Sequence, residues 1–168
     1  MCIVVVLDIN GVLGIVTKVR MFNKTPDAVL PSKQYFYQRD YVEATFKSIS
    51  DAIGHNGRIV IWTSRLRKNA EPIERLLPHK YISAYFHGED CPTNIGFHPI
   101  KNAKNLRYKL GIPESDHIIF VDDSPKYIMG DDNSSIVAVE TCNESLDRLN
   151  IDTILKHIEN VRGSNILC

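Results

Sequence analysis

The chain has 168 residues, and its 20 basic and 20 acidic side chains give a formal net charge of zero. This length fits one domain, residues 1–168, that can bury a core without disulfides or metals. The neutral balance gives no overall electrostatic case for binding nucleic acid or an anionic membrane. The four cysteines lie far apart and form no CxxC pair, so neither a disulfide framework nor a zinc knuckle is indicated.

The apolar runs of the chain are short. None approaches the roughly 18 apolar residues of a membrane span. The first run lacks a basic leader and is interrupted by Asp8, which is not the pattern of a signal peptide. We therefore expect a monomer of the cytoplasm or nucleus that has no membrane partner.

The opening residues predict a strand buried on both faces. Residues 3–7 are all apolar, three of them Val, and Asp8, Ile9, Asn10 and Gly11 follow. A carboxylate at the end of such a strand lies where open α/β sheets keep their chemistry. An ordinary turn after a strand is the structural alternative for this stretch considered alone.

The rest of the chain alternates helical and strand patterns. After a short strand within 12–19 and a polar loop at 23–33, the stripe Val42, Phe46, Ile49, Ile53 predicts a helix that stops at Gly54. Residues 58–62 predict a second buried strand, which ends in Thr63 and Ser64. Strand, helix and strand in this order imply a right-handed parallel crossover, so Thr63 should emerge at the same sheet edge as Asp8.

Further elements follow in the same alternation. We expect a helix at 69–77, a strand at 81–86, an irregular segment at 88–99 and a helix at 101–110. The strand predicted at 118–121 runs directly into Asp122 and Asp123, and Ser124 with Pro125 fits a helix N-cap and first-turn proline. A strand at 136–139 precedes a last helix with apolar positions from Leu146 to Ile158.

Polar groups thus end three predicted strands at one sheet edge. Carboxylates crowded together cost free energy unless a cation binds between them, and oxygen ligands of this kind suit Mg²⁺, which is often completed by a substrate phosphate. A phosphate also needs donors, which the Thr63 hydroxyl and the backbone amides after Asp8 supply, and a lysine, for which Lys104 and Lys101 are candidates. For these lysines a solvated helix face is the alternative.

Several motifs in order resemble the haloacid dehalogenase (HAD) superfamily. They are Asp8-Ile-Asn10-Gly-Val12, Thr63, Lys104 and Asp122-Asp123. More narrowly, the chain is similar to the FCP/SCP or NLI-interacting-factor-like phosphatases, which include RNA polymerase II C-terminal-domain phosphatases. The narrower resemblance is carried by Tyr37-Gln-Arg39, Trp62-Thr63-Ser64, Asn69-Ala-Glu-Pro-Ile73, Lys104-Asn-Leu106, Leu110-Gly111 and Ile119-Phe-Val-Asp-Asp-Ser-Pro125.

The resemblance implies a fold and a set of roles. The fold would be a three-layer α/β/α Rossmannoid domain with a mostly parallel central sheet and no large cap. Asp8 would be the nucleophile that forms an aspartyl phosphate. The phosphate would be held by Asp8, Ile9, Asn10, Thr63, Ser64 and Lys104, and Mg²⁺ by Asp8, the Asn10 carbonyl, Asp122 and, through water, Asp123.

Asn10 departs from the family pattern. Its relatives have an Asp there that acts as general acid and base, so the proton-transfer step should slow by roughly 10²- to 10⁴-fold while metal and phosphate binding survive. Three explanations stay open. The chain is a substituted form of an active phosphatase, a naturally slow enzyme, or a pseudophosphatase that serves as a binding module.

The substrate implied by the resemblance is phosphoserine or phosphothreonine in a protein segment. Tyr81, Tyr85, Phe86 and Phe97 are candidates for an apolar pocket beside it, or alternatively ordinary core aromatics. A nucleotide or a nucleic-acid end stays open as a substrate, although nothing in the composition indicates nucleic acid.

Overall fold

The computed structural model describes residues 1–164 of the chain, and a parallel sheet lies at its centre. The strand order is β11-β9-β1-β5-β6, and every neighbouring pair is parallel. Its strands are β1 (Ile3–Leu7), β5 (Arg58–Trp62), β6 (Ile82–Phe86), β9 (His117–Asp122) and β11 (Ser134–Ala138). The two strands that precede the acidic residues, β1 and β9, are therefore adjacent at the middle of the sheet.

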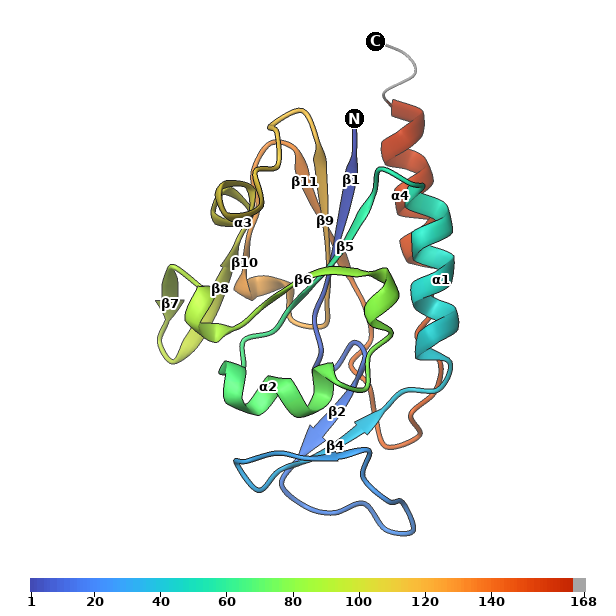
Figure 1. Cartoon of the computed structure of the whole chain (residues 1–168), viewed down its shortest axis with the longest axis vertical. Coiled ribbons are helices and arrows are strands. Elements are labelled where there is room, and N and C mark those ends of the chain that lie inside the picture. The colour runs from blue at the N-terminus through green and yellow to red at the C-terminus, as the bar shows by residue number, and fades with distance from the viewer. Residues whose placement is uncertain (165–168) are drawn as a thin grey trace.

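Helices cover both faces of this sheet (Figure 1). On one face α1 (Val42–Ile53) and α4 (Asp152–Ser164) pack against Ile3, Val5 and Leu7 of β1. On the other face α3 (Ala103–Leu110) packs against Val4 and Val6. Alternate residues of β1 thus lie in the cores on opposite faces of the sheet. This is why apolar and polar residues do not alternate along the run. The α/β fold with a parallel central sheet is confirmed.

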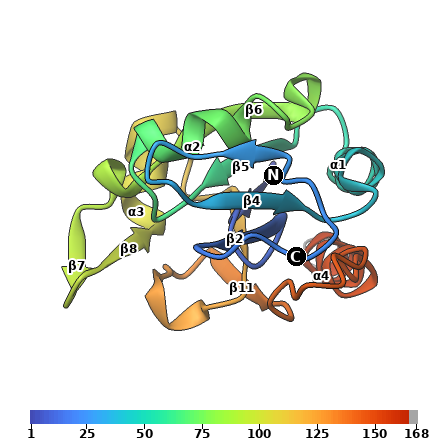
Figure 2. The ribbon, with the colours of Figure 1, turned by 90° about the horizontal axis from the view of Figure 1, so that it is seen from below.

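Two small sheets flank the central one. Beyond the carboxyl ends of the parallel strands, β2 (Gly14–Thr17), β3 (Ala28–Val29) and β4 (Tyr35–Gln38) form an antiparallel sheet in the order β2-β4-β3. Seen from that end, this sheet and α2 (Arg67–Glu74) lie over the edge at which the parallel strands finish (Figure 2). The second small sheet contains β7 (Thr93–Ile95), β8 (His98–Asn102) and β10 (Ile128–Met129). Both small sheets are built from strands of two to five residues.

The structure corrects several expected boundaries. The segment 88–99 is not irregular throughout, because it contains the β7–β8 hairpin. The helix expected from residue 101 begins at Ala103, since the Asn102 side chain accepts a hydrogen bond from the Asn105 N–H and caps it. After β9 the chain forms only a 3₁₀ turn (Pro125–Tyr127), and the Ser124 side chain makes no capping bond. The last helix begins at Asp152, so Leu146 and Leu149 lie before it.

Among residues 1–164, no helix combines the length and the apolar composition that crossing a membrane requires.

Candidate active site

The site is built on Asp8, which follows the last residue of β1. All five residues of β1 are buried, and the Asp8 N–H donates to the Val121 carbonyl at 3.1 Å, so the backbone of Asp8 is fixed by the neighbouring strand β9. In the register of these strands, Leu7 is opposite Val121. Asp8 and Asp122 consequently leave the sheet side by side, and both are buried, at 8% and 4% exposure.

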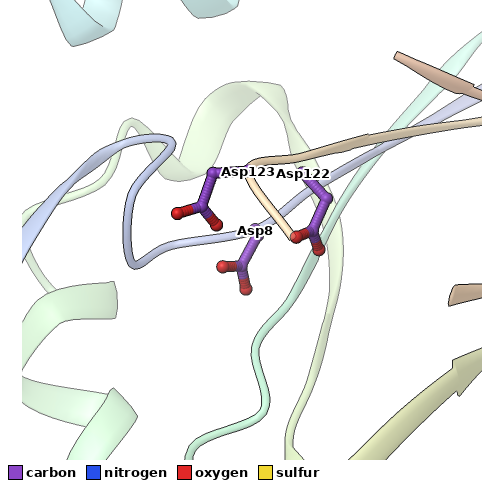
Figure 3. Close-up of side chains that lie close together, drawn as sticks. All are labelled: Asp8, Asp122 and Asp123. Atoms are coloured by element: carbon purple, nitrogen blue, oxygen red, sulfur yellow. The ribbon is translucent and has the colours of Figure 1, made fainter. Parts of the chain in front are cut away.

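Asp8, Asp122 and Asp123 form one acidic cluster. Each offers a carboxylate oxygen that lies within 4.8 Å of the others, and Figure 3 shows the three side chains around a common space. Gly11, at φ 86°, makes room for the third member, because a Cβ at this position would collide with the Asp123 carboxylate. Thr141 donates to Asp123 at 2.8 Å, and the Ser124 N–H donates to Asp122 at 2.7 Å.

The lysine at this cluster is Lys101. Its Nζ lies 2.8 Å from Asp8 Oδ1 and 2.6 Å from Asp122 Oδ2, and the residue is 4% exposed. The expectation for Lys104 is corrected: Lys104 is on the exposed side of α3 and lines a different hollow with Tyr108 and Glu114. The two lysines differ because α3 begins only at Ala103. Lys101 belongs to β8, which points its side chain at the sheet edge, whereas Lys104 is in the first turn of α3.

Burial and neighbouring charges set the protonation of this cluster. Burial raises the pKa of Asp8 to about 6; Asp122 adds to the rise, while Lys101 and the Ile9 N–H oppose it. Burial lowers the pKa of the Lys101 ammonium, but Asp8 and Asp122 outweigh it, so this pKa lies above its ordinary value. Lys101 is therefore charged at neutral pH, and added positive charge beside Asp8 will favour the ionised form of its carboxyl group.

Thr63 and Ser64 follow the other neighbour of β1. Leu7 is opposite Ile61 in the β1–β5 pair, so Thr63 lies one residue beyond the position opposite Asp8. Thr63 is 1% exposed; its N–H donates to the Phe86 carbonyl at 3.0 Å and its Oγ1 accepts the Arg65 N–H at 3.3 Å. Ser64 is exposed. The register thus gathers Asp8, Thr63 and Asp122 at one edge of the sheet, as the sequence predicts.

Asn10 lies in the turn that joins β1 to β2. Its side-chain Oδ1 accepts a hydrogen bond from the Val16 N–H at 2.8 Å, and its backbone bridges to Gly14. This bond uses only the oxygen of the side chain, so an aspartate would satisfy it equally well. The turn therefore does not require an amide at this position.

Two arginines near the site were not singled out as site residues from the sequence. Arg39, 9% exposed, donates to the carbonyls of Gly11, Glu140 and Asp147 and so ties the loop after Asp8 to the segment after β11. Arg65 follows Ser64 and donates from Nη1 to Gln34 at 2.9 Å. The sequence shows that Arg65 lies two residues after Thr63, but the burial of Arg39 and of the Arg65 Nε is visible only in the fold.

The four aromatic residues considered for an apolar pocket do not gather there. Phe86 is a core residue whose ring lies 5.4 Å from that of Trp62. Phe97 is fully exposed in the β7–β8 turn, and the Tyr85 hydroxyl bonds to His79 at 2.8 Å. The expected pocket is therefore not formed by this set, because Phe86 faces the interior and Phe97 faces solvent.

The acidic cluster can hold a divalent metal ion. Oxygen ligands at about 2 Å from Mg²⁺ lie at most about 4 Å apart across the ion, which is close to the spacing of these carboxylates. Three carboxylates and one ammonium also leave a net negative charge in a buried place, which a cation would offset. The donor set and its spacing fit a hard cation.

Comparisons with known proteins show the family of this chain. The model of the NLI interacting factor-like phosphatases matches residues 3–164, and the chain belongs to that family. No curated protein matches the chain. Among solved structures, the chain is similar to that of Fcp1, described as an essential RNA polymerase II CTD phosphatase, with a TM-score of 0.58 and 13% sequence identity.

The similarity to Fcp1 concerns the fold. The match covers 97% of this chain and 48% of the Fcp1 chain, so this chain spans about half the length of that relative. The fold is therefore the HAD fold that the motifs led us to expect.

Proposed function

We propose that this chain is a Mg²⁺-dependent phosphomonoester phosphatase whose nucleophile is Asp8. The observation that supports it most is the meeting of Asp8, Asp122 and Lys101 at 2.6 to 2.8 Å, with Asp123 completing the acidic cluster. Bound Mg²⁺, held by Asp8, the Asn10 carbonyl, Asp122 and Asp123, supplies positive charge for the phosphoryl oxygens.

The first chemical step is attack by Asp8. Its carboxylate oxygen forms a bond to phosphorus as the bond from phosphorus to the leaving oxygen breaks, which yields an aspartyl phosphate. Lys101 keeps Asp8 ionised and oriented. The Thr63 hydroxyl and the amides of Ile9, Asn10 and Ser64 donate to the phosphoryl oxygens, on which negative charge is spread.

Asn10 limits both halves of the reaction. It cannot protonate the leaving oxygen, so that proton comes from water, and it cannot accept a proton from the water that later hydrolyses the aspartyl phosphate. A weakly basic leaving group such as nitrophenolate needs no proton, whereas a serine alkoxide does. The chain as given should therefore release nitrophenol in a fast first turnover and then slow down as the phosphorylated form accumulates.

The test is hydrolysis of para-nitrophenyl phosphate with Mg²⁺ by three proteins. We expect weak turnover by the chain as given, recovery by about 10²- to 10⁴-fold in Asn10→Asp, and complete loss when Asp8→Asn is added to that variant. Activity from a contaminating phosphatase would not be lost on the Asp8→Asn substitution. If Asn10→Asp has no more activity than the double variant that carries both Asn10→Asp and Asp8→Asn, the phosphatase proposal is wrong.

For the substrate class we propose phosphoserine or phosphothreonine in a protein segment, as the family membership favours, and we place the protein in the cytoplasm or nucleus as a monomer. The Asn10→Asp variant should hydrolyse phosphoserine peptides with a higher kcat/KM than nucleoside monophosphates or 5′-phosphorylated oligonucleotides. The reverse order would favour the nucleotide or nucleic-acid alternative.

A second candidate is a binding module that no longer turns over substrate. It is favoured by Asn10, which lacks the proton-transfer group while every other site residue is retained. Such a module would still bind phosphate and Mg²⁺ but would stay inactive in Asn10→Asp, so the same assay separates the two.

A further inference from the structure

Three arginines with buried or partly buried side chains differ in the acceptors that their guanidinium groups find. Arg107 forms a two-bond ion pair with Asp131, and Arg39 donates to three backbone carbonyls. Arg65 is half-buried and donates from its side chain to one neutral acceptor, Gln34; its Nε, like that of Arg39, is buried with no hydrogen-bond partner in the described part of the chain. A buried charged donor without an acceptor is costly, so its retention calls for an explanation.

The position of Arg65 supplies one. Its own N–H donates to the Thr63 hydroxyl at 3.3 Å, and its carbonyl accepts the Gly88 N–H at 2.7 Å, so the backbone of Arg65 is fixed beside the phosphate-binding threonine. Gln34, which precedes β4, then holds one end of the guanidinium from the small sheet that lies over the site. A planar, fixed guanidinium is well suited to binding phosphate oxygens in pairs.

The balance of charges at the site also favours a role for Arg65 in binding phosphate. Burial lowers the pKa of Arg65, and the negative charge of Asp8 opposes this lowering. Lys101 is already used by Asp8 and Asp122. A phosphomonoester brings further negative charge to this place, and a cationic side chain beside Mg²⁺ and Lys101 would help to offset it.

We propose that Arg65 is a substrate-binding residue whose guanidinium contacts the phosphoryl oxygens of the bound phosphomonoester, with Gln34 as its positioning residue. This rests on the proposed phosphatase function and adds a cation to its phosphate site.

The test is titration of inorganic phosphate into the full chain in the presence of Mg²⁺, followed by calorimetry. Arg65→Gln should weaken phosphate binding by about tenfold or more, since it removes a charged hydrogen-bond donor. Gln34→Ala, which keeps the charge but frees the guanidinium, should weaken it by less. Arg67→Gln is the matched control, because it removes the same charge from an exposed position two residues away and should leave binding within about twofold.

Kinetics in the Asn10→Asp background give a second readout. Arg65→Gln should raise the KM for para-nitrophenyl phosphate and the inhibition constant of phosphate together, and Arg65→Lys should restore part of the loss. If Arg65→Gln lowers the melting temperature yet binds phosphate as the unchanged chain does, Arg65 is a structural tether and the inference is wrong. If the unchanged chain itself binds no phosphate, the phosphatase proposal fails and this inference fails with it.

Discussion

Two buried ion-pair clusters differ in how well their charges are balanced. One is centred on Lys101 and the other on Arg107, six residues later in the chain. At Lys101 one ammonium faces two carboxylates, with a third nearby. At Arg107 one guanidinium meets one carboxylate, that of Asp131 at 2.7 Å, and donates its remaining protons to the carbonyls of Pro113, Asp116 and Asn133.

The pKa values of the aspartates record the difference. Burial raises the pKa of Asp8 to about 6, whereas the hydrogen bond from Arg107 is the main cause that lowers the pKa of Asp131. The Arg107 cluster is complete and stabilises the fold, because every charge has a partner. The Lys101 cluster has an excess of negative charge, which is unfavourable until a cation binds. Ionised residues in a core thus stabilise the fold in one place and form the candidate ligand site in the other.

Loss of Lys101 should have the largest effect on catalysis. In the Asn10→Asp background, Lys101→Met should reduce kcat by at least about 10²- to 10³-fold, the usual result of losing a group that stabilises transition-state charge. The measurement is nitrophenol release with saturating Mg²⁺. Loss of activity that merely tracks unfolding, seen by circular dichroism, would instead give Lys101 a structural role.

Loss of Arg107 should act on stability alone. Arg107→Leu leaves the Asp131 carboxylate and three carbonyls without their donor. We expect the free energy of unfolding to fall by about 3 kcal/mol or more. Urea denaturation measures this, and kcat of the remaining folded protein should stay within about twofold. A large fall in kcat at full folding would show that the two clusters are not independent.

The two aspartates should give stability changes of opposite sign. For metal-free protein, the folded state binds more protons than the unfolded state at pH values between 3.8 and about 6, because the pKa of Asp8 is raised, so stability falls as pH rises through that window. Asp8→Asn should remove this loss and raise the melting temperature at pH 7.5 in chelator.

Asp131→Asn is the matched variant at the other cluster. The folded pKa of Asp131 is lowered, so its contribution to stability is present above its ordinary pKa of 3.8 and is lost as pH falls through the folded value. Asp131→Asn should therefore lower the melting temperature at pH 7.5. Equal shifts of the same sign in the two variants would contradict the comparison.

Lys104 should show the smallest effect. It lies on the exposed side of α3 and makes no contact with the acidic cluster. Lys104→Gln should change kcat and the melting temperature by less than the scatter of replicate measurements, because surface charges contribute little. A loss of activity comparable to that of Lys101→Met would restore Lys104 as the phosphate-binding lysine.

This contrast between Lys101 and Lys104 shows what the sequence could and could not predict. The strands β1, β5 and β9 are readable because their apolar runs end in polar residues, and the order of the motifs then places Asp8, Thr63 and Asp122 at one edge. Strand β8 cannot be predicted in the same way, because it pairs with β7 and with β10, and β10 lies more than twenty residues away in the chain. Long-range pairing of this kind leaves no local pattern.

One local signal was available at that place. Asn102 followed by Ala103 is a typical N-cap and helix start, and it would have placed the start of the helix after Lys101 and left Lys101 in an extended segment. The role of Arg65, in contrast, depends on how much of its guanidinium is buried and on which acceptors it lacks. Those properties follow only from packing.

The most direct test of the nucleophile is to locate the phosphoryl group. The chain as given is incubated with Mg²⁺ and para-nitrophenyl phosphate, quenched in acid and examined by peptide mass spectrometry. We predict one phosphoryl group on the peptide that contains Asp8, accumulated because Asn10 slows its hydrolysis, and none in Asp8→Asn. Nitrophenol release with no phosphoryl group on Asp8, or with the group on another residue, would contradict the assignment.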